Sequence, residues 1–188
     1  MARILDKPSV RYAALPISVE QYHRLNREGI IGERTEQLRG VIIERMTKSP
    51  LHTYVVQLLT KWLESQVAAN QYVRKEEPLT LVDSEPEPDV AVVSGDPKQF
   101  RTQHPTSADL VIEVAIATLA LDRDKAEIYA HAGVAEYWVV IPEERVVEIY
   151  RQPSDAGYAS FQRVHESEAR LSPACLPQAN LSIAALFD

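Results

Sequence analysis

The chain has little of several features that would place it in a special class. It contains a single cysteine, Cys175, which excludes an internal disulfide and a cysteine-based zinc cluster. No run approaches the roughly 18 apolar residues that a membrane helix needs. The first 16 residues lack the apolar segment and small-residue cleavage site of a signal peptide. We therefore expect a cytoplasmic protein with no membrane partner.

Positive charge is also scarce. Twenty lysines and arginines stand against 27 aspartates and glutamates, which gives a formal net charge of −7. This balance argues against a general nucleic-acid binder, because phosphate contacts require lysine and arginine. It does not exclude an enzyme that acts on DNA, because carboxylates that hold divalent metals make the formal charge more negative than that of the loaded site.

The length and composition are ordinary for a globular protein. The 188 residues are 45% hydrophobic and 25% charged, which suffices for one domain with a full hydrophobic core. We expect a single domain over residues 1–188, with a core of about 18–165. An irregular N-terminal segment at 1–16 and a C-terminal extension at 166–188 would flank this core.

Hydrophobic periodicity and turn residues predict a mixed α/β fold, with a mixed sheet flanked by helices. Ser18 and Ser49 are typical helix N-caps, and Gly29 is a helix stop. The expected helices cover 19–28, 51–70 and 122–133. The expected strands cover 33–40, 41–46, 72–75, 79–82, 89–93, 110–114, 136–141, 145–152 and 157–164.

The stretch from Ser107 to Ile141 is the most informative one. It predicts a strand, a helix and a second strand, and the first strand, LVIEV, carries Glu113 among apolar residues. An isolated carboxylate is costly to bury, so Glu113 needs a partner or a metal. The helix that follows has Asp122, Lys125 and Tyr129 at helical spacing.

Three acids occur inside or at the edge of expected strands: Glu36, Asp89 and Glu113. Neighbouring strands would bring these carboxylates together. Mg²⁺ and Mn²⁺ take carboxylate oxygens as ligands, and a metal held this way lowers the pKa of bound water and stabilises charge on a phosphoryl oxygen. Lys125 could orient that water or neutralise the developing charge.

Each of these residues also has a simpler interpretation. Asp89 at a strand edge could be solvated, and Lys125 could be an ordinary solvent-facing helical lysine. Glu36 could pair with a nearby arginine. Glu85 and Glu87 are expected to be solvated loop acids beside Asp89.

Four stretches together resemble a known family. They are ERTEQLRGVIIERMTKSPLH, EPEPDVAVV, HPTSADLVIEVA and LALDRDKAEIYAHAGVAEYWVV. In this order they resemble the Uma-two family, described as putative restriction endonucleases and similar in fold to the PD-(D/E)XK nuclease superfamily. The resemblance runs from about residue 33 to 141. It implies a restriction-endonuclease-like α/β core, Mg²⁺- or Mn²⁺-dependent cleavage of DNA, and a homodimer.

The resemblance also assigns catalytic roles. Pro88–Asp89 matches the PD motif, so that Asp89 and Glu113 would be the metal ligands. Lys125 matches a lysine on the following helix, with Tyr129 four positions later. Glu36 matches an upstream acid that assists metal binding.

Other residues are expected to surround these groups: His52, Glu76, Asp122 and Tyr129. His52 matches the family's histidine at the start of the long helix. A local hydrogen bond at the helix start is the alternative interpretation of His52.

Two other functions stay open. In the superfamily the lysine lies two positions after the second acid, where this chain has Ala115, and Ile116–Ala117 is apolar. With the net negative charge, these residues motivate a catalytically decayed, non-enzymatic binding or assembly domain with the same fold. A metal-dependent hydrolase of another phosphoester is the third alternative.

Overall fold

The structure is a computed structural model, and it describes residues 8–168 and 170–188. Its α-helices are α1 (Pro8–Ala13), α2 (Val19–Arg27), α3 (Pro50–Glu64), α4 (Leu119–His131) and α5 (Ala184–Phe187). Its strands are β1 (Thr35–Leu38), β2 (Val41–Glu44), β3 (Gln71–Lys75), β4 (Val90–Ser94), β5 (Leu110–Val114), β6 (Glu136–Ile141), β7 (Val146–Ser154), β8 (Gly157–His165), β9 (Arg170–Leu171) and β10 (Leu181–Ser182). Short 3₁₀ helices are η2 (Pro97–Phe100), η3 (Pro142–Glu144) and η4 (Glu166–Glu168).

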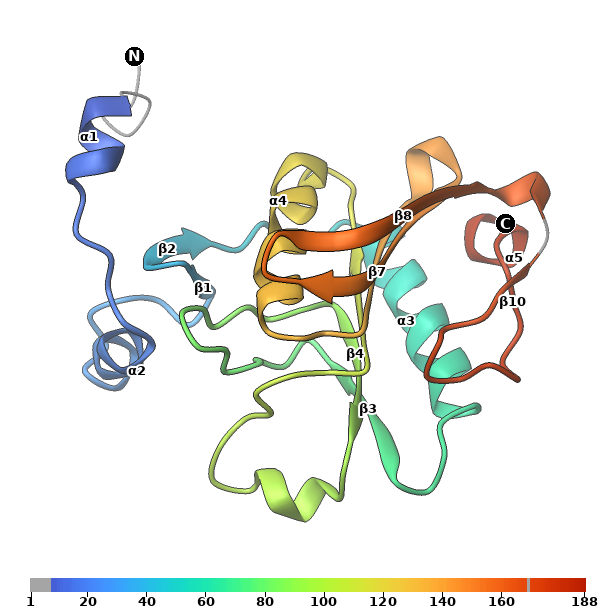
Figure 1. Cartoon of the computed structure of the whole chain (residues 1–188), viewed down its shortest axis with the longest axis horizontal. Coiled ribbons are helices and arrows are strands. Elements are labelled where there is room, and N and C mark those ends of the chain that lie inside the picture. The colour runs from blue at the N-terminus through green and yellow to red at the C-terminus, as the bar shows by residue number, and fades with distance from the viewer. Residues whose placement is uncertain (1–7, 169) are drawn as a thin grey trace.

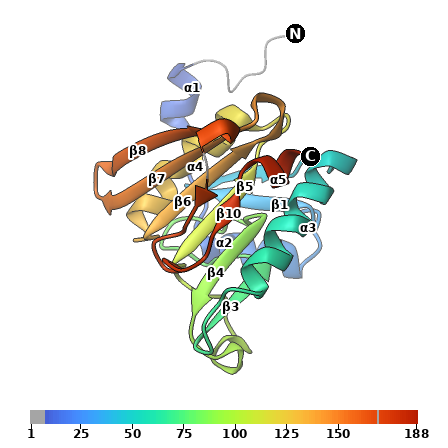
Figure 2. The same ribbon diagram turned by 90° about the vertical axis from the view of Figure 1, so that its right-hand side faces the viewer.

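Six strands form one twisted sheet in the order β3-β4-β5-β6-β7-β8 (Figure 1 and Figure 2). All neighbours pair antiparallel except β5 and β6, which are parallel and are joined through α4. A parallel pair needs such a crossover, whereas antiparallel pairs are joined by short turns. β1 and β2 form a separate two-stranded hairpin. The predicted mixed α/β fold is confirmed.

The two faces of the sheet bury different partners. Because side chains alternate along a strand, Leu110, Ile112 and Val114 of β5 join the apolar layer that contains α3. Val111 lies in the opposite layer, beneath α4. Figure 2 shows α3 and α5 on one side of the sheet and α4 on the other. Glu113 therefore faces α4, the helix that carries Lys125.

The C-terminal segment belongs to the hydrophobic core rather than extending from it. Its apolar side chains pack in the same cluster as α3 and the sheet, namely Leu171, Leu176, Ala179, Leu181, Ile183 and Leu186. The C-terminal segment therefore contributes buried side chains to the core. The spacing of these apolar residues between prolines gives no periodic signal in the sequence, although each side chain is buried.

The capping residues explain two helix starts. Ser18 and Gln21 form a complete capping box at the start of α2, and the Ser49 hydroxyl accepts from the His52 backbone N–H at the start of α3. The expected helix over 51–70 ends earlier, at Glu64. Here the Ser65 hydroxyl donates to the Trp62 carbonyl at 2.6 Å and competes with the helical bonds.

Three other expectations need correction. α4 begins one turn earlier than predicted, at Leu119, and this places Asp122 inside the helix. Residues 79–82 are not a strand: the Leu81 N–H donates to the Ser84 carbonyl at 2.9 Å, which closes a turn. Residues 8–13 of the expected irregular segment form α1, because Pro8 suits the first position of a helix. Residues 1–7 lie outside the described part.

Within residues 8–168 and 170–188, no helix combines the length and the apolar character needed to cross a membrane.

The turn between β1 and β2 requires glycine, and this turn positions Glu36. Gly40 has φ +84°, and a Cβ added there would lie 2.2 Å from the Pro16 Cβ. Gly133 also has positive φ, +71°, but a Cβ there would meet nothing within 4 Å.

We expect Gly133→Ala to lower the free energy of unfolding by about 1 kcal/mol. Gly40→Ala should lower it by about 2–4 kcal/mol, because steric overlap with Pro16 adds to the backbone strain. Urea denaturation measures both, and equal losses would contradict the steric argument.

Candidate active site

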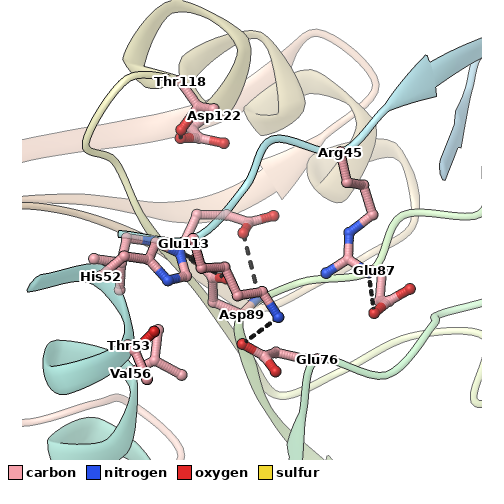
Figure 3. A network of polar contacts seen from close by, with 12 residues as sticks. Arg45, His52, Thr53, Val56, Glu76, Glu87, Asp89, Glu113, Thr118 and Asp122 are labelled. Atoms are coloured by element: carbon pink, nitrogen blue, oxygen red, sulfur yellow. Dashed lines mark hydrogen bonds and ion pairs between the residues drawn. The ribbon is translucent and has the colours of Figure 1, made fainter. Parts of the chain in front are cut away.

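A cavity of about 180 Å³ lies where the end of β5, the start of α4 and the connection between β2 and α3 meet. Its walls are unusually rich in charged side chains. The acids are Glu36, Glu44, Glu87, Asp89, Glu113 and Asp122, and the basic residues are Arg45, Lys48, His52 and Lys125. Figure 3 shows His52, Asp89 and Glu113 close together at the centre of this group.

Glu113 is buried and fully hydrogen-bonded. Its side chain lies on the α4 face of β5, and the residue is 4% exposed. Its Oε1 accepts from Lys125 Nζ at 3.0 Å and from the Tyr129 hydroxyl at 3.0 Å. Its Oε2 accepts from the Asp89 backbone N–H at 3.2 Å. The spacing of Lys125 and Tyr129 by one helical turn aims both donors at the same oxygen.

Lys125 forms ion pairs with acids on two strands, Glu36 of β1 and Glu113 of β5. Its Nζ lies 3.0 Å from Glu113 Oε1 and 3.1 Å from Glu36 Oε1, and the residue is 5% exposed. Asp122 Oδ1 is 4.0 Å away on the preceding turn of α4. Glu36 Oε2 also accepts from the Glu87 backbone N–H at 3.3 Å. The solvent-facing interpretation of Lys125 is wrong.

The site has more carboxylates than the lysine can neutralise. Burial raises the pKa of Glu113 to about 8, against the opposing effect of Lys125 and with the carboxylates of Asp89, Asp122 and Glu36 adding to the rise. Burial alone would lower the pKa of Lys125, but Glu113, Glu36 and Asp122 raise it above its ordinary value. The ammonium is therefore charged, whereas burial and the neighbouring acids shift Glu113 towards its protonated form.

Asp89 is fixed by the backbone of β5 and by α3. Its Oδ2 accepts from the Val114 backbone N–H at 2.8 Å, and His52 Nε2 lies 3.0 Å from the carboxylate. The residue is buried, so the solvated interpretation of Asp89 is wrong. The backbone N–H of His52 does make the local bond at the helix start, but its ring contacts Asp89.

The donor atoms fit a divalent cation. His52, Glu76 and Asp89 each offer one ligand atom, and these atoms all lie within 4.8 Å of one another. Glu113 lies outside this cluster because its Oε1 faces Lys125 and Tyr129, although it lines the same cavity. Carboxylate oxygens with one imidazole nitrogen suit Mn²⁺ and related ions. Metal ligation by Asp89 and Glu113 stays a prediction.

Asp122 supports the site from within α4. Its Oδ2 accepts from the Thr118 hydroxyl at 2.6 Å, and its backbone carbonyl accepts from the Tyr137 hydroxyl at 2.7 Å. Burial raises the pKa of Asp122, while Lys125 and the Thr118 hydrogen bond oppose the rise. These contacts fix the first turn of α4 and thereby the position of Lys125.

The structure thus brings the sequence-predicted residues into one place. Six of them line the cavity: Glu36, His52, Asp89, Glu113, Asp122 and Lys125. Tyr129 contacts Glu113 from outside the cavity. Glu76 lies at its edge, where it pairs with Lys48 at 2.7 Å. Ala115, in the position of the superfamily lysine, is buried beneath α4, and Lys125 reaches Glu113 from the helix instead.

Two loop acids differ from expectation. Glu85 is 4% exposed, and its Oε1 lies 3.0 Å from His23 Nε2. Glu87 is half-buried and pairs with Arg45. Burial is the main cause that raises the pKa of Glu87, while Arg45 opposes it. Proline-rich loops usually indicate exposure, so the packing of this loop into the fold could not be predicted from its residues.

Two basic residues of the β2–α3 connection were not among the expected site residues. Arg45 and Lys48 line the cavity and pair with Glu87 and Glu76. The only available signal was their position just before His52, in the stretch ERMTKSPLH.

Comparison with a solved structure identifies the fold class. The fold is similar to the crystal structure of a protein from Anabaena variabilis described as a putative nuclease belonging to DUF820. The TM-score is 0.76 at 20% sequence identity, over 92% of this chain and 98% of that chain. At this identity the likeness establishes the fold alone. A search of curated proteins found no match.

The family follows from the sequence. The model of the Uma2 family, described as "Putative restriction endonuclease", matches residues 19–184. Because the match covers most of the chain, the protein belongs to the Uma2 family. The expected family is confirmed, and the matched region extends past residues 33–141 on both sides.

The pKa of Glu113 makes stability depend on pH. In the folded protein its pKa is about 8, against an ordinary value of 4.5, so between these values the folded state holds a proton that the unfolded state has released. The contribution of Glu113 to stability is therefore full below about pH 4.5 and is lost as the pH rises towards 8. With a chelator present, we expect the free energy of unfolding of the wild type to fall between pH 5 and 8 relative to that of Glu113→Gln.

Urea denaturation at several pH values measures this difference. Glu64→Gln, an exposed change on α3, is the control and should follow the wild-type curve. Parallel curves for the wild type and Glu113→Gln would contradict the raised pKa.

Proposed function

We propose that the protein is a Mg²⁺- or Mn²⁺-dependent endonuclease that hydrolyses phosphodiester bonds in DNA. The observation that carries the proposal is the contact of Lys125 Nζ with Glu113 Oε1 at 3.0 Å, in a cavity that also holds Asp89. An acid pair can hold a divalent metal, and a buried lysine beside it can stabilise the negative charge that develops on a phosphoryl oxygen. Membership of the Uma2 family supports the same reaction class.

Asp89 is the first residue that would hold the metal, with Glu113 beside it. When bound, the metal would activate water and stabilise negative charge on the phosphoryl oxygens. The hydrogen bond from the Val114 N–H and the contact with His52 keep the Asp89 carboxylate in one orientation. A fixed ligand reduces the reorganisation that the reaction would otherwise require.

Lys125 would act on the attacking water or on the developing phosphoryl charge. Because neighbouring carboxylates raise its pKa, the ammonium stays charged throughout the physiological range. It therefore serves as an electrostatic group and hydrogen-bond donor rather than as a base. Glu36 and Glu113 hold Nζ at 3.1 and 3.0 Å, so the ammonium is already positioned before substrate binds.

Cleavage of DNA tests the proposal. We expect plasmid and linear duplex DNA to be cut in the presence of Mg²⁺ or Mn²⁺. Asp89→Asn and Lys125→Met should each lower the rate by about 100-fold or more, the usual cost of removing one preorganised electrostatic group. Asp89→Asn is nearly isosteric, so its effect is read without a change in side-chain volume.

Lys61→Met is the matched control, because Lys61 is exposed on α3 and lies outside the cavity. It should cut DNA at the wild-type rate. Absence of cleavage at every enzyme concentration, or equal rates for the wild type and Asp89→Asn, would contradict the proposal. Either result would favour the non-enzymatic binding domain, whose paired charges would then serve structure alone.

A further inference from the structure

We propose that His52, Glu76 and Asp89 together form a cation site that prefers Mn²⁺ to Mg²⁺. When no metal is bound, the Lys48 ammonium pairs with Glu76 in its place. The inference rests on the proposed function, because it specifies the metal of that same site. It adds ligands from α3 and from the end of β3 to the expected pair of acids.

The geometry of the three donors supports a shared ion. Two ligands on opposite sides of an ion with bonds of about 2.1 Å lie about 4.2 Å apart. The donor atoms of His52, Glu76 and Asp89 lie within 4.8 Å of one another, so shifts of less than about 1 Å would bring all three into contact with one ion. His52 lies in α3, Glu76 directly follows β3 and Asp89 directly precedes β4, so the fold holds the donors together before an ion arrives.

Glu76 is held in place by its backbone. It directly follows β3, and its N–H donates to the Asp89 carbonyl at 3.1 Å. Its φ of +54° lies in the left-handed region, which side chains other than glycine, asparagine and aspartate rarely adopt. This conformation and the hydrogen bond tie Glu76 directly to the residue that carries the first metal ligand.

His52 is able to become a ligand. Its Nε2 lies 3.0 Å from the Asp89 carboxylate, whereas its Nδ1 is buried and has no hydrogen-bond partner among the described residues. Because a carboxylate only accepts, the contact with Asp89 places a proton on Nε2 in the metal-free protein. A metal bound at Nε2 would replace that proton, and the neutral ring would then carry its proton on Nδ1. Imidazole favours transition metals over Mg²⁺, which dehydrates reluctantly and prefers oxygen.

Lys48 places a positive charge beside Glu76. Its Nζ lies 2.7 Å from Glu76 Oε1, and its side chain is 37% exposed, so the ammonium can swing out to water. Lys48 lines the cavity, whereas Glu76 does not. Metal binding would therefore exchange one cation for another at Glu76, and Lys48 would compete with the metal.

Titration calorimetry and the spin-resonance spectrum of Mn²⁺, with MnCl₂ or MgCl₂ as the only ligand, test the inference. We expect tighter binding of Mn²⁺ than of Mg²⁺. Glu76→Gln should weaken Mn²⁺ binding by about tenfold or more, which corresponds to 1.4 kcal/mol. Lys48→Met should tighten it by up to about fivefold, because it removes a partly exposed competing ion pair. A purely structural Lys48–Glu76 pair would not produce this gain.

Glu77→Gln is the control: it is the neighbouring acid, it is mostly exposed, and it pairs with Arg74 instead. It should bind Mn²⁺ like the wild type. Thermal denaturation of each metal-free variant verifies that it is folded.

The outcomes separate this inference from the proposed function. Wild-type Mn²⁺ affinity in Glu76→Gln, with binding lost in Glu113→Gln, would overturn the His52–Glu76–Asp89 site and leave the nuclease proposal standing. Absence of Mn²⁺ binding in both the wild type and Lys48→Met would overturn the cation site and the metal dependence together.

Discussion

The ion pair between Lys125 and the carboxylates of Glu113 and Glu36 is the interaction on which the site depends. It joins α4, β5 and the β1–β2 hairpin at one buried point, and its distances are 3.0 and 3.1 Å. A buried charge without a partner is strongly destabilising. The sheet, the hairpin and the crossover helix must therefore meet in this register, because any other register would leave a charge unpaired in an apolar layer.

The same constraint gives the site its electrostatic character. One ammonium faces several buried carboxylates, and burial raises the pKa of Glu113 to about 8 in the absence of metal. A divalent cation would relieve this excess of negative charge, which is why an acid-rich cavity in an acidic protein is compatible with binding a phosphodiester. The net charge of −7 describes the whole chain, whereas the loaded site would be less negative.

The sequence predicted the elements of the fold and the centre of the site well. The acid inside LVIEV indicated that Glu113 needs a partner or a metal, and the family resemblance placed Lys125 and Tyr129 at the same site; these three side chains do meet. Short-range patterns could not show that the C-terminal segment is part of the core or that residues 79–82 form a turn. The contact of Lys48 with Glu76 was also hidden, because it joins segments that only the folded chain brings together.

A crystal structure grown with Mn²⁺ and a short DNA duplex tests the central claim most directly. The account predicts an anomalous scattering peak about 2–2.5 Å from the Asp89 carboxylate, with Lys125 Nζ and a phosphate oxygen facing the same ion or its water. A cavity that contains DNA but no metal at Asp89, or a metal bound only at a distant surface site, would contradict it.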